Sequence, residues 1–188
     1  MELFQDYKVY PEGFFYWDEF LTIEEEASLL RVIATIPLHT FVFQGYEAKR
    51  RVASFGYDYS FNNRRLTSGN PIPETFRPLI EKVAQKLNKP AEVFSELLIT
   101  EYPPGAVINW HRDAPPFDII AGISLKASCT FRLRPHATNK EVTTRKIIPV
   151  PLAPRSLYLI TDDARTVWEH STAPVKDTRY SITLRTLR

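Results

Sequence analysis

The sequence predicts a mainly β fold, a sandwich or barrel of short strands with two helices near the N-terminus. From residue 92 onward, strand-like segments alternate with turns rich in Pro, Gly and Asp. Before that point, two segments carry apolar residues at helical spacing. Residues 179–187 alternate polar and apolar side chains, which is typical of a strand with one face on a core.

Both helices have recognisable starts and ends. Thr22-Ile23-Glu24-Glu25 is a capping box, in which a hydroxyl begins the helix and a carboxylate follows three residues later. Pro37 stops this helix. The second helix tolerates Pro78 only in its first turn, and Asn88 and Pro90 close it. We expect both helices to pack an apolar stripe on a sheet.

The predicted strands follow one another through the second half of the chain. Phe117–Leu125 is almost continuously apolar, which is typical of a strand buried on both faces. Residues 1–20 are rich in aromatic side chains and should form an extended entry segment on the core. The expected strands are Phe94–Tyr102, Ala106–His111, Phe117–Leu125, Cys129–Arg134, Val142–Val150, Ser156–Thr161, Thr166–His170 and 179–187.

Size and composition indicate one ordinary globular domain of 188 residues. The net charge of +2 neither requires nor excludes a polyanionic partner. The single cysteine, Cys129, excludes an internal disulfide and a cysteine-based zinc site, and fits a reducing compartment. Because there is no leader-like segment and no long apolar run, we expect a cytoplasmic protein with no membrane association. We also expect a monomer.

The candidate site residues lie in the last third of the chain. If the strand ending at His111 continues, the side chains of His111 and Asp113 project to the same side. His170 supplies a second imidazole. Two histidines and one carboxylate form the ligand set that leaves positions open on non-haem Fe(II). A lone His-x-Asp can also be a surface pair or a hydrogen-bonded core pair, so His170 supplies the support for a metal site.

The closing strand carries a polar row formed by Arg179, Ser181, Thr183 and Arg185. The opposite row, Tyr180, Ile182 and Leu184, is apolar. Two guanidiniums and two hydroxyls suit a dicarboxylate, because guanidinium binds carboxylate through two parallel hydrogen bonds. Both arginines could instead form structural ion pairs.

Residues 43–65 mix cations with aromatic rings, including Lys49-Arg50-Arg51 and Phe55-Gly56-Tyr57. Such a mixture is used by nucleic-acid surfaces, where cations bind phosphates and rings stack on bases. It equally describes a hairpin with one solvated face and its aromatics in the core. Both interpretations stay open on the residues alone. Arg64-Arg65 and Arg132/Arg134 are further candidates for phosphate contacts.

His111-Arg112-Asp113, His170 and Arg179-x-Ser181-x-Thr183-x-Arg185 resemble the signature of the AlkB family of Fe(II)/2-oxoglutarate-dependent dioxygenases. The resemblance covers residues 94–187 and extends to Tyr102-Pro103-Pro104-Gly105. It implies a double-stranded β-helix (jelly roll) with N-terminal helices packed on the sheet.

The resemblance also implies a single AlkB-like domain over residues 1–188. Residues 1–91 would hold the N-terminal helices and a substrate lid around 41–65, and residues 92–188 would form the jelly-roll catalytic core.

The resemblance assigns Fe(II) to His111, Asp113 and His170, with 2-oxoglutarate and O2 as co-substrates. Arg179 would bind the distal (C5) carboxylate and Arg185 would lie near the C1 carboxylate. The residues expected to bind 2-oxoglutarate are Tyr102, Thr100, Arg179, Ser181, Thr183 and Arg185. Those expected to contact the substrate are Phe55, Tyr57, Lys49, Arg50 and Arg51, with Phe55 resembling a lid aromatic that stacks on a flipped base.

The activity implied by the resemblance is oxidative dealkylation of bases in DNA or RNA, as in DNA repair, by N-alkyl hydroxylation and aldehyde release. Nucleic acid would then be the partner, with the target base flipped out or single-stranded. Two departures concern Thr100, where many members have Asn, and Pro115, where several nucleic-acid members have an acidic residue. The same chemistry on a protein or small molecule, and a non-catalytic jelly-roll binding module, remain as alternatives.

Overall fold

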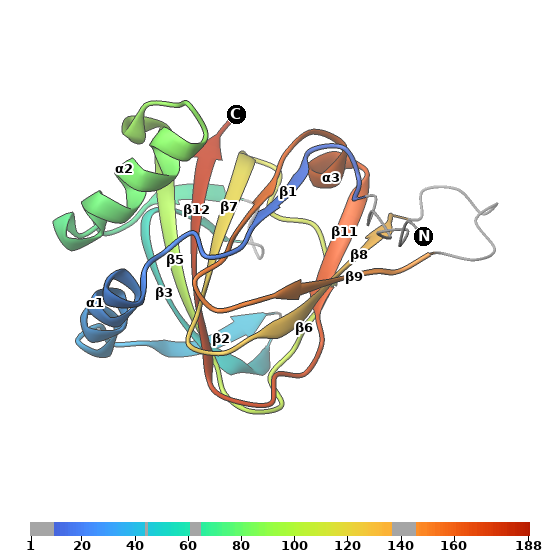
Figure 1. Cartoon of the computed structure of the whole chain (residues 1–188), viewed down its shortest axis with the longest axis horizontal. Helices are drawn as coiled ribbons and strands as arrows, with labels where there is room; N and C mark the ends of the chain where they lie inside the picture. Colours follow the sequence, from blue (N-terminus) through green and yellow to red (C-terminus); the bar gives the residue numbers. More distant parts are fainter. Residues whose placement is uncertain (1–9, 44, 61–64, 137–145) are drawn as a thin grey trace, which may run out of the picture.

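Two antiparallel sheets form the body of the protein, and two helices cover the outer face of the larger sheet (Figure 1). The structure is a computed structural model of the chain and describes residues 10–43, 45–60, 65–136 and 146–188. The predicted fold class, a jelly roll with N-terminal helices packed on the sheet, is confirmed.

Strands and helices follow one another along the chain without a repeating pattern. The strands are β1 (Phe14–Trp17), β2 (His39–Phe43), β3 (Tyr46–Ser60), β4 (Arg65–Ser68), β5 (Phe94–Tyr102), β6 (Ile108–His111), β7 (Phe117–Leu125), β8 (Cys129–Pro135), β9 (Ile148–Leu152), β10 (Leu157–Ile160), β11 (Trp168–Thr172) and β12 (Arg179–Leu187). The helices are α1 (Ile23–Ala34), α2 (Arg77–Lys86) and α3 (Asp162–Thr166), with short 3-10 turns at Glu74–Phe76 and Ala91–Val93.

The large sheet has the strand order β1-β10-β7-β12-β5-β3-β2, and β4 pairs with β3 beside this path. The small sheet has the order β6-β11-β8-β9. Because β2 and β3 precede residue 92 yet extend the sheet built by the later strands, the two halves of the chain share one body.

Apolar residues gather on both faces of the large sheet. On its outer face, Ile33 of α1 and Val83 of α2 pack with Leu97 of β5. On its inner face, towards the small sheet, Ile160 of β10 packs with Phe131 of β8. Strand β7 contributes to both clusters, as predicted for a strand buried on both sides.

The helix ends follow the local chemistry of the sequence. The Glu25 backbone N–H donates to the Thr22 hydroxyl at 3.2 Å, and the Thr22 backbone N–H donates to the Glu25 carboxylate at 2.7 Å, which confirms the capping box. Pro78 lies in the first turn of α2, as expected. Asn88, with a φ of +52°, follows the end of that helix.

Two predicted elements were wrong. Thr166 ends α3, a helix too short to show periodicity, and the next strand begins at Trp168. Strand β3 covers Tyr46–Ser60, a stretch that is absent from the expected strands because its sequence shows no clean alternation. Residues 1–9, 44, 61–64 and 137–145, which include parts of the expected entry segment, lid and Val142–Val150 strand, lie outside the described residues.

Strand β3 changes its partner at Gly56. Residues 51–56 pair with β5, whereas residues 57–60 pair with β4. Gly56 has a φ of +82°, and a Cβ atom there would lie 2.2 Å from the Ser95 carbonyl oxygen. Only glycine suits this position, at which β3 leaves β5 and begins to pair with β4.

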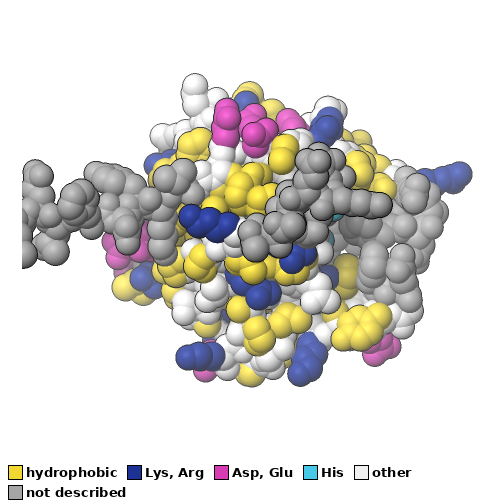
Figure 2. All heavy atoms as spheres, turned by 90° about the vertical axis from the view of Figure 1, so that its right-hand side faces the viewer, with side chains coloured by type: hydrophobic (Ala, Val, Ile, Leu, Met, Phe, Trp, Pro, Cys, Tyr) yellow, Lys and Arg dark blue, Asp and Glu magenta, His cyan; other side chains and the backbone are white. Residues whose placement is uncertain are grey.

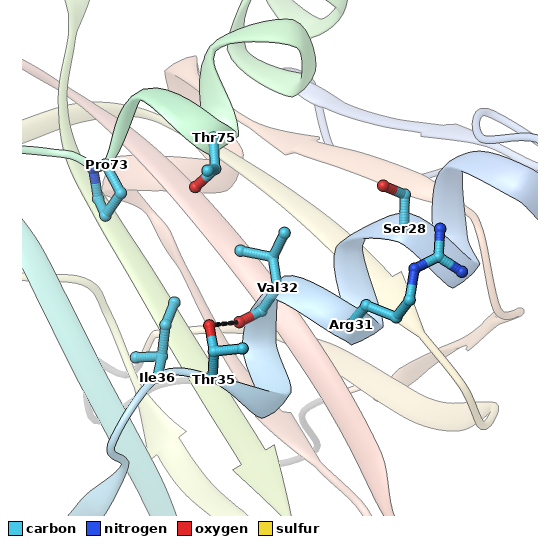
Figure 3. A pocket seen from close by; sticks show the side chains of 7 residues that line it. All are labelled: Ser28, Arg31, Val32, Thr35, Ile36, Pro73 and Thr75. Atoms are coloured by element: carbon cyan, nitrogen blue, oxygen red, sulfur yellow. Dashed lines mark hydrogen bonds between the residues drawn. The ribbon is translucent and has the colours of Figure 1, made fainter.

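A pocket of 360 Å³ lies between α1 and the segment that precedes α2 (Figure 3). Arg31 is the one charged residue among those lining it, and the Thr35 hydroxyl donates to the Val32 carbonyl at 2.8 Å. This pocket lies on the helical side of the molecule and has no group of titratable side chains. It is therefore not the candidate site.

Gly122 of β7 faces Tyr158 of β10 so closely that a Cβ atom would lie 2.0 Å from the tyrosine ring. We expect Gly122→Ala to lower the free energy of unfolding by about 1–3 kcal/mol, because the buried ring must move. Urea unfolding measures this loss. Adding Tyr158→Leu should remove part of the penalty, and simple additivity of the two substitutions would contradict the proposed clash.

Candidate metal centre

The two predicted histidines face each other across a strand pair. His111 ends β6 and is the register partner of His170 in β11. Their ring centroids are 4.3 Å apart, and Asp113 Oδ2 is 3.4 Å from His170 Nε2. One potential ligand atom from each of the three side chains lies within 4.8 Å of the others. The structure therefore brings together His111, Asp113 and His170 as a group that could hold a metal ion.

Among the described residues, only one of the two carboxylate oxygens of Asp113 has hydrogen-bond partners. Its Oδ1 accepts from Arg185 Nε at 3.1 Å and from Arg185 Nη2 at 2.8 Å. Its Oδ2 is buried and has no hydrogen-bond partner among the described residues. A buried carboxylate oxygen without a partner is costly, and a metal ion beside the two histidines would complete its interactions.

The charge of Asp113 is maintained by its surroundings. Burial is the largest single influence and raises the pKa of this carboxyl, but Arg185 together with His170, His111 and Arg165 outweighs burial and holds the pKa well below its usual range. Arg185 also donates from Nη1 to Glu96 Oε2 at 2.7 Å, across the β12–β5 pair. Arg185 is thus clamped between two carboxylates, and sequence reasoning did not identify Glu96.

His170 is held in its neutral form. Burial lowers its pKa to about 3, with a contribution from His111 that outweighs the attraction of Asp113. A neutral imidazole keeps a lone pair available for a metal ion, so this environment suits a ligand.

We expect the metal-free protein to lose stability as the pH falls from about 6.5 towards about 3. His170 stays neutral in the folded protein over this window, whereas the unfolded chain takes up a proton on the same imidazole. The unfolded state thus binds the extra proton, and the free energy of unfolding should fall by up to about 1.4 kcal/mol per pH unit. Urea unfolding of chelator-treated protein at several pH values measures this slope. His170→Gln should flatten it; an unchanged slope would contradict the assignment.

Arg179 is a buried cation on the same face of β12 as Arg185, at the opposite end of that strand. It is only 2% exposed, its Nε donates to the Ser124 hydroxyl at 3.0 Å, and its guanidinium lies 4.8 Å from the Tyr102 ring centroid. Within the ranges that the structure describes, no carboxylate lies within 4.0 Å of it. A buried guanidinium without an anion is the arrangement expected of an anion-binding site.

The remaining members of the predicted polar row share the inner face of the large sheet. Ser181 is the register partner of Thr100, and its hydroxyl is 3.4 Å from the Tyr102 hydroxyl. Thr183 is buried beside them on β12. The opposite row packs on the outer core, as predicted. Leu187 follows Arg185 by two residues and packs on the inner cluster, on the same face as the arginines. The pairing of β12 with β5 shifts its register between these two residues.

Two buried residues near the site were missed. Tyr158 lies over Gly122, and burial together with Tyr102 raises the pKa of its hydroxyl above the usual range, so this group is neutral. The sequence signal that could have indicated a bulky neighbour was a glycine, Gly122, inside an apolar strand. Arg165 of α3 donates from Nη2 to the carbonyls of Ala114 and Phe117, at 2.7 and 2.8 Å, and so holds the turn after Asp113.

The structure does not place several of the predicted substrate residues beside the group formed by His111, Asp113 and His170. Phe55 packs on the outer cluster beneath the helices, so it lies on the wrong side of the sheet to contact a substrate there. Arg51 forms an ion pair with Glu101. Tyr57 is 39% exposed on the β3–β4 hairpin, and Lys49 is exposed. Tyr59, rather than Phe55, packs on the inner cluster.

Arg132 and Arg134 lie on the small sheet against Trp110. Their guanidinium carbons are 5.1 and 4.0 Å from the ring centroid of Trp110. Arg134 also pairs with Glu169, which His136 contacts at 3.0 Å. Both arginines therefore have partners in the chain itself, and their expected phosphate contacts stay a prediction.

Comparison with known proteins places the chain in a family. A family model described as the 2OG-Fe(II) oxygenase superfamily matches residues 23–186. The chain therefore belongs to the 2OG-Fe(II) oxygenase superfamily. This family implies Fe(II), 2-oxoglutarate and O2, and the His111, Asp113 and His170 group could hold the metal.

Within the superfamily, the chain is AlkB-like. It is 27% identical over 172 residues to the mouse (Mus musculus) tRNA (carboxymethyluridine(34)-5-O)-methyltransferase ALKBH8, covering 88% of this chain and 25% of that protein. It is 27% identical over 185 residues to the alkylated DNA repair protein ALKBH8 homolog of Arabidopsis thaliana, covering 84% of this chain and 50% of that protein.

Two further similarities involve an uncharacterized protein and a solved structure. The chain is 33% identical over 132 residues to the uncharacterized protein L905 of Acanthamoeba polyphaga mimivirus, covering 62% of this chain and 59% of that protein. The solved structure of OsALKBH1 superimposes with a TM-score of 0.70 at 15% identity, covering 95% of this chain and 98% of that one, which confirms the fold. The chain thus spans about a quarter to three fifths of the curated relatives it matches. No helix in its described ranges is long and apolar enough to cross a membrane.

Proposed function

We propose that residues 1–188 form one AlkB-like domain, an Fe(II)/2-oxoglutarate-dependent dioxygenase that removes alkyl groups oxidatively from bases of DNA or RNA. One observation carries the enzymatic part of this proposal. The same inner surface holds a buried Asp113 oxygen without a hydrogen-bond partner and a buried Arg179 guanidinium without a carboxylate, among the described residues. A metal ion and a dicarboxylate would complete both.

Each residue of the site would have a separate task. His111, Asp113 and His170 would hold the iron, which when bound supplies the oxidative decarboxylation of 2-oxoglutarate coupled to hydroxylation of a C–H bond. Arg185 would keep Asp113 ionised and orient it, so that Oδ2 faces the histidines. Arg179 would bind the C5 carboxylate of 2-oxoglutarate.

Four hydroxyl-bearing side chains would complete the co-substrate site. They lie on the inner face between the two arginines and would line the co-substrate with hydroxyl groups, which both donate and accept hydrogen bonds. These residues are Thr100, Tyr102, Ser181 and Thr183.

Nucleic acid as the substrate is supported by three observations. The printed names of two relatives refer to tRNA and to alkylated DNA. On the face shown in Figure 2, Lys and Arg side chains lie near the middle as well as at the edges, whereas Asp and Glu side chains lie near the edges. The β3–β4 hairpin presents Tyr57 to solvent and packs Tyr59 on the inner cluster, and such rings could stack on a flipped base.

Succinate formation from 2-oxoglutarate tests this proposal. The chain loaded with Fe(II) should release succinate slowly by itself and faster with alkylated oligonucleotides, with aldehyde appearing in proportion. Unmodified oligonucleotides serve as the control. Absence of succinate under all conditions would leave only a non-catalytic jelly-roll binding module.

The same chemistry on a protein or small molecule is the second candidate, favoured by Pro115. This residue occupies the position at which several nucleic-acid members carry an acidic residue. Succinate release stimulated by peptides or small metabolites but not by oligonucleotides, together with no oligonucleotide binding at low salt, would favour this candidate.

A further inference from the structure

Three side chains form a cross-strand row at one end of the inner face. Tyr102 of β5 is the register partner of Arg179 of β12. On its other side β5 pairs with β3, where Arg51 is the partner of Glu101, so Arg50 is the next residue towards Tyr102. Because strand side chains alternate, Arg50 shares the face of Tyr102, whereas Arg51 belongs to the opposite face. Tyr102 therefore lies between two arginines.

The surroundings of Arg50 confirm this placement. Its guanidinium carbon lies 3.9 Å from the ring centroid of Phe41, which holds the plane of the cation. Burial lowers the pKa of Arg50, and Tyr102 is the group that acts on it in the opposite direction. Arg50 is half-buried, and within the part of the chain that the structure describes no carboxylate lies within 4.0 Å of it.

Arg179 alone would give a buried carboxylate only one charged partner. Its Nε already donates to the Ser124 hydroxyl and is therefore not available to a ligand. A carboxylate has two oxygens and about four lone-pair sites. A second cation near Tyr102 would supply the missing donors and strengthen the attraction for a dianion over a monoanion.

We propose that Arg50 is a specificity-determining residue that binds the distal carboxylate of the co-substrate from the β3 side of Tyr102, opposite Arg179. This inference rests on the proposed function, since it requires a dicarboxylate at Arg179. Arg50 would thus favour 2-oxoglutarate over keto acids without a distal carboxylate. The predicted contact of Arg50 with a nucleic-acid phosphate becomes the rival outcome.

The neighbouring arginine provides a matched control for the test. Arg51→Gln removes the same charge one residue away, but from the outer face, where Arg51 pairs with Glu101. Arg50→Gln and Arg51→Gln are each loaded with Mn(II), and titration calorimetry measures the binding of 2-oxoglutarate and of 2-oxopentanoate, which has a methyl group in place of the distal carboxylate. Thermal melting of the ligand-free proteins checks that both variants fold.

Arg50→Gln should weaken 2-oxoglutarate binding roughly tenfold, because one charge-assisted contact is lost at a half-buried site. Arg50→Gln should bind 2-oxopentanoate as tightly as the wild type does. Arg51→Gln should leave the binding of both keto acids unchanged. Arg50→Lys should bind 2-oxoglutarate more tightly than Arg50→Gln but less tightly than the wild type. Unchanged 2-oxoglutarate binding, or an equal loss for both keto acids, would overturn the inference. Weaker binding of an oligonucleotide alone would assign Arg50 to a phosphate instead. A wild-type chain that binds no 2-oxoglutarate would overturn the proposed function itself.

Discussion

Asp113→Ala is expected to abolish iron-dependent succinate formation and to weaken metal binding by more than about a hundredfold. Asp113 is the one carboxylate in the group of three, and its free Oδ2 lies 3.4 Å from His170 Nε2. The substitution leaves two neutral imidazoles, and it also leaves the Arg185 guanidinium beside them with Glu96 as its remaining carboxylate. The loss should therefore exceed that of an ordinary ligand change.

Two measurements separate loss of the metal from loss of the fold. Metal content after dialysis and titration with Mn(II) report the site, while circular dichroism reports the fold. Asp177→Ala, at an exposed position in the turn before β12, is the matched control and should behave as the wild type. If Asp113→Ala retains full turnover, the metal assignment is wrong.

Arg179→Met should have opposite effects on co-substrate binding and on stability. The affinity for 2-oxoglutarate should fall by roughly 30- to 1,000-fold, because the carboxylate loses a buried, charge-assisted partner. The ligand-free protein should become more stable by about 1 kcal/mol or more, since a buried guanidinium without an anion is replaced by an apolar side chain. A site built for stability would not show this reversal.

Urea unfolding with and without 2-oxoglutarate, on the Mn(II)-loaded protein, measures both effects. The wild type should gain stability from 2-oxoglutarate, and the methionine variant should gain almost none. Arg179→Lys keeps the charge but loses the planar fork, so it should bind with intermediate affinity. A destabilised ligand-free Arg179→Met protein would contradict an anion-binding role and indicate a structural one.

The parts of the site that depend on local alternation were predictable from the sequence. His111 and Asp113 share a side because they are two residues apart, and the same rule separates Arg179 from Tyr180. The meeting of His111 with His170 depends on the pairing of β6 with β11. Alternation contains no information on such a pairing, so it came from the family resemblance.

Residues that look alike in the sequence are separated where backbone pairing decides which face each of them occupies. Phe55 and Tyr59 look equivalent in the sequence, but the change of partner at Gly56 puts Phe55 on the outer cluster and Tyr59 on the inner one. Lys49-Arg50-Arg51 likewise reads as one basic cluster. In a strand its members face different ways, and Glu101 comes to Arg51 only through the β3–β5 register. Glu96 reaches Arg185 through the β5–β12 register in the same way.

The position of β12 has a consequence for the spacing within the proposed site. Hydrogen bonds to β5 and β7 hold this strand on both sides, and its register is unbroken from Arg179 to Arg185. At a rise of about 3.3 Å per residue, the Cα atoms of the two arginines stand about 20 Å apart. Because Arg185 holds Asp113, the distance between the proposed metal centre and the buried cation Arg179 is fixed by the backbone of a single strand.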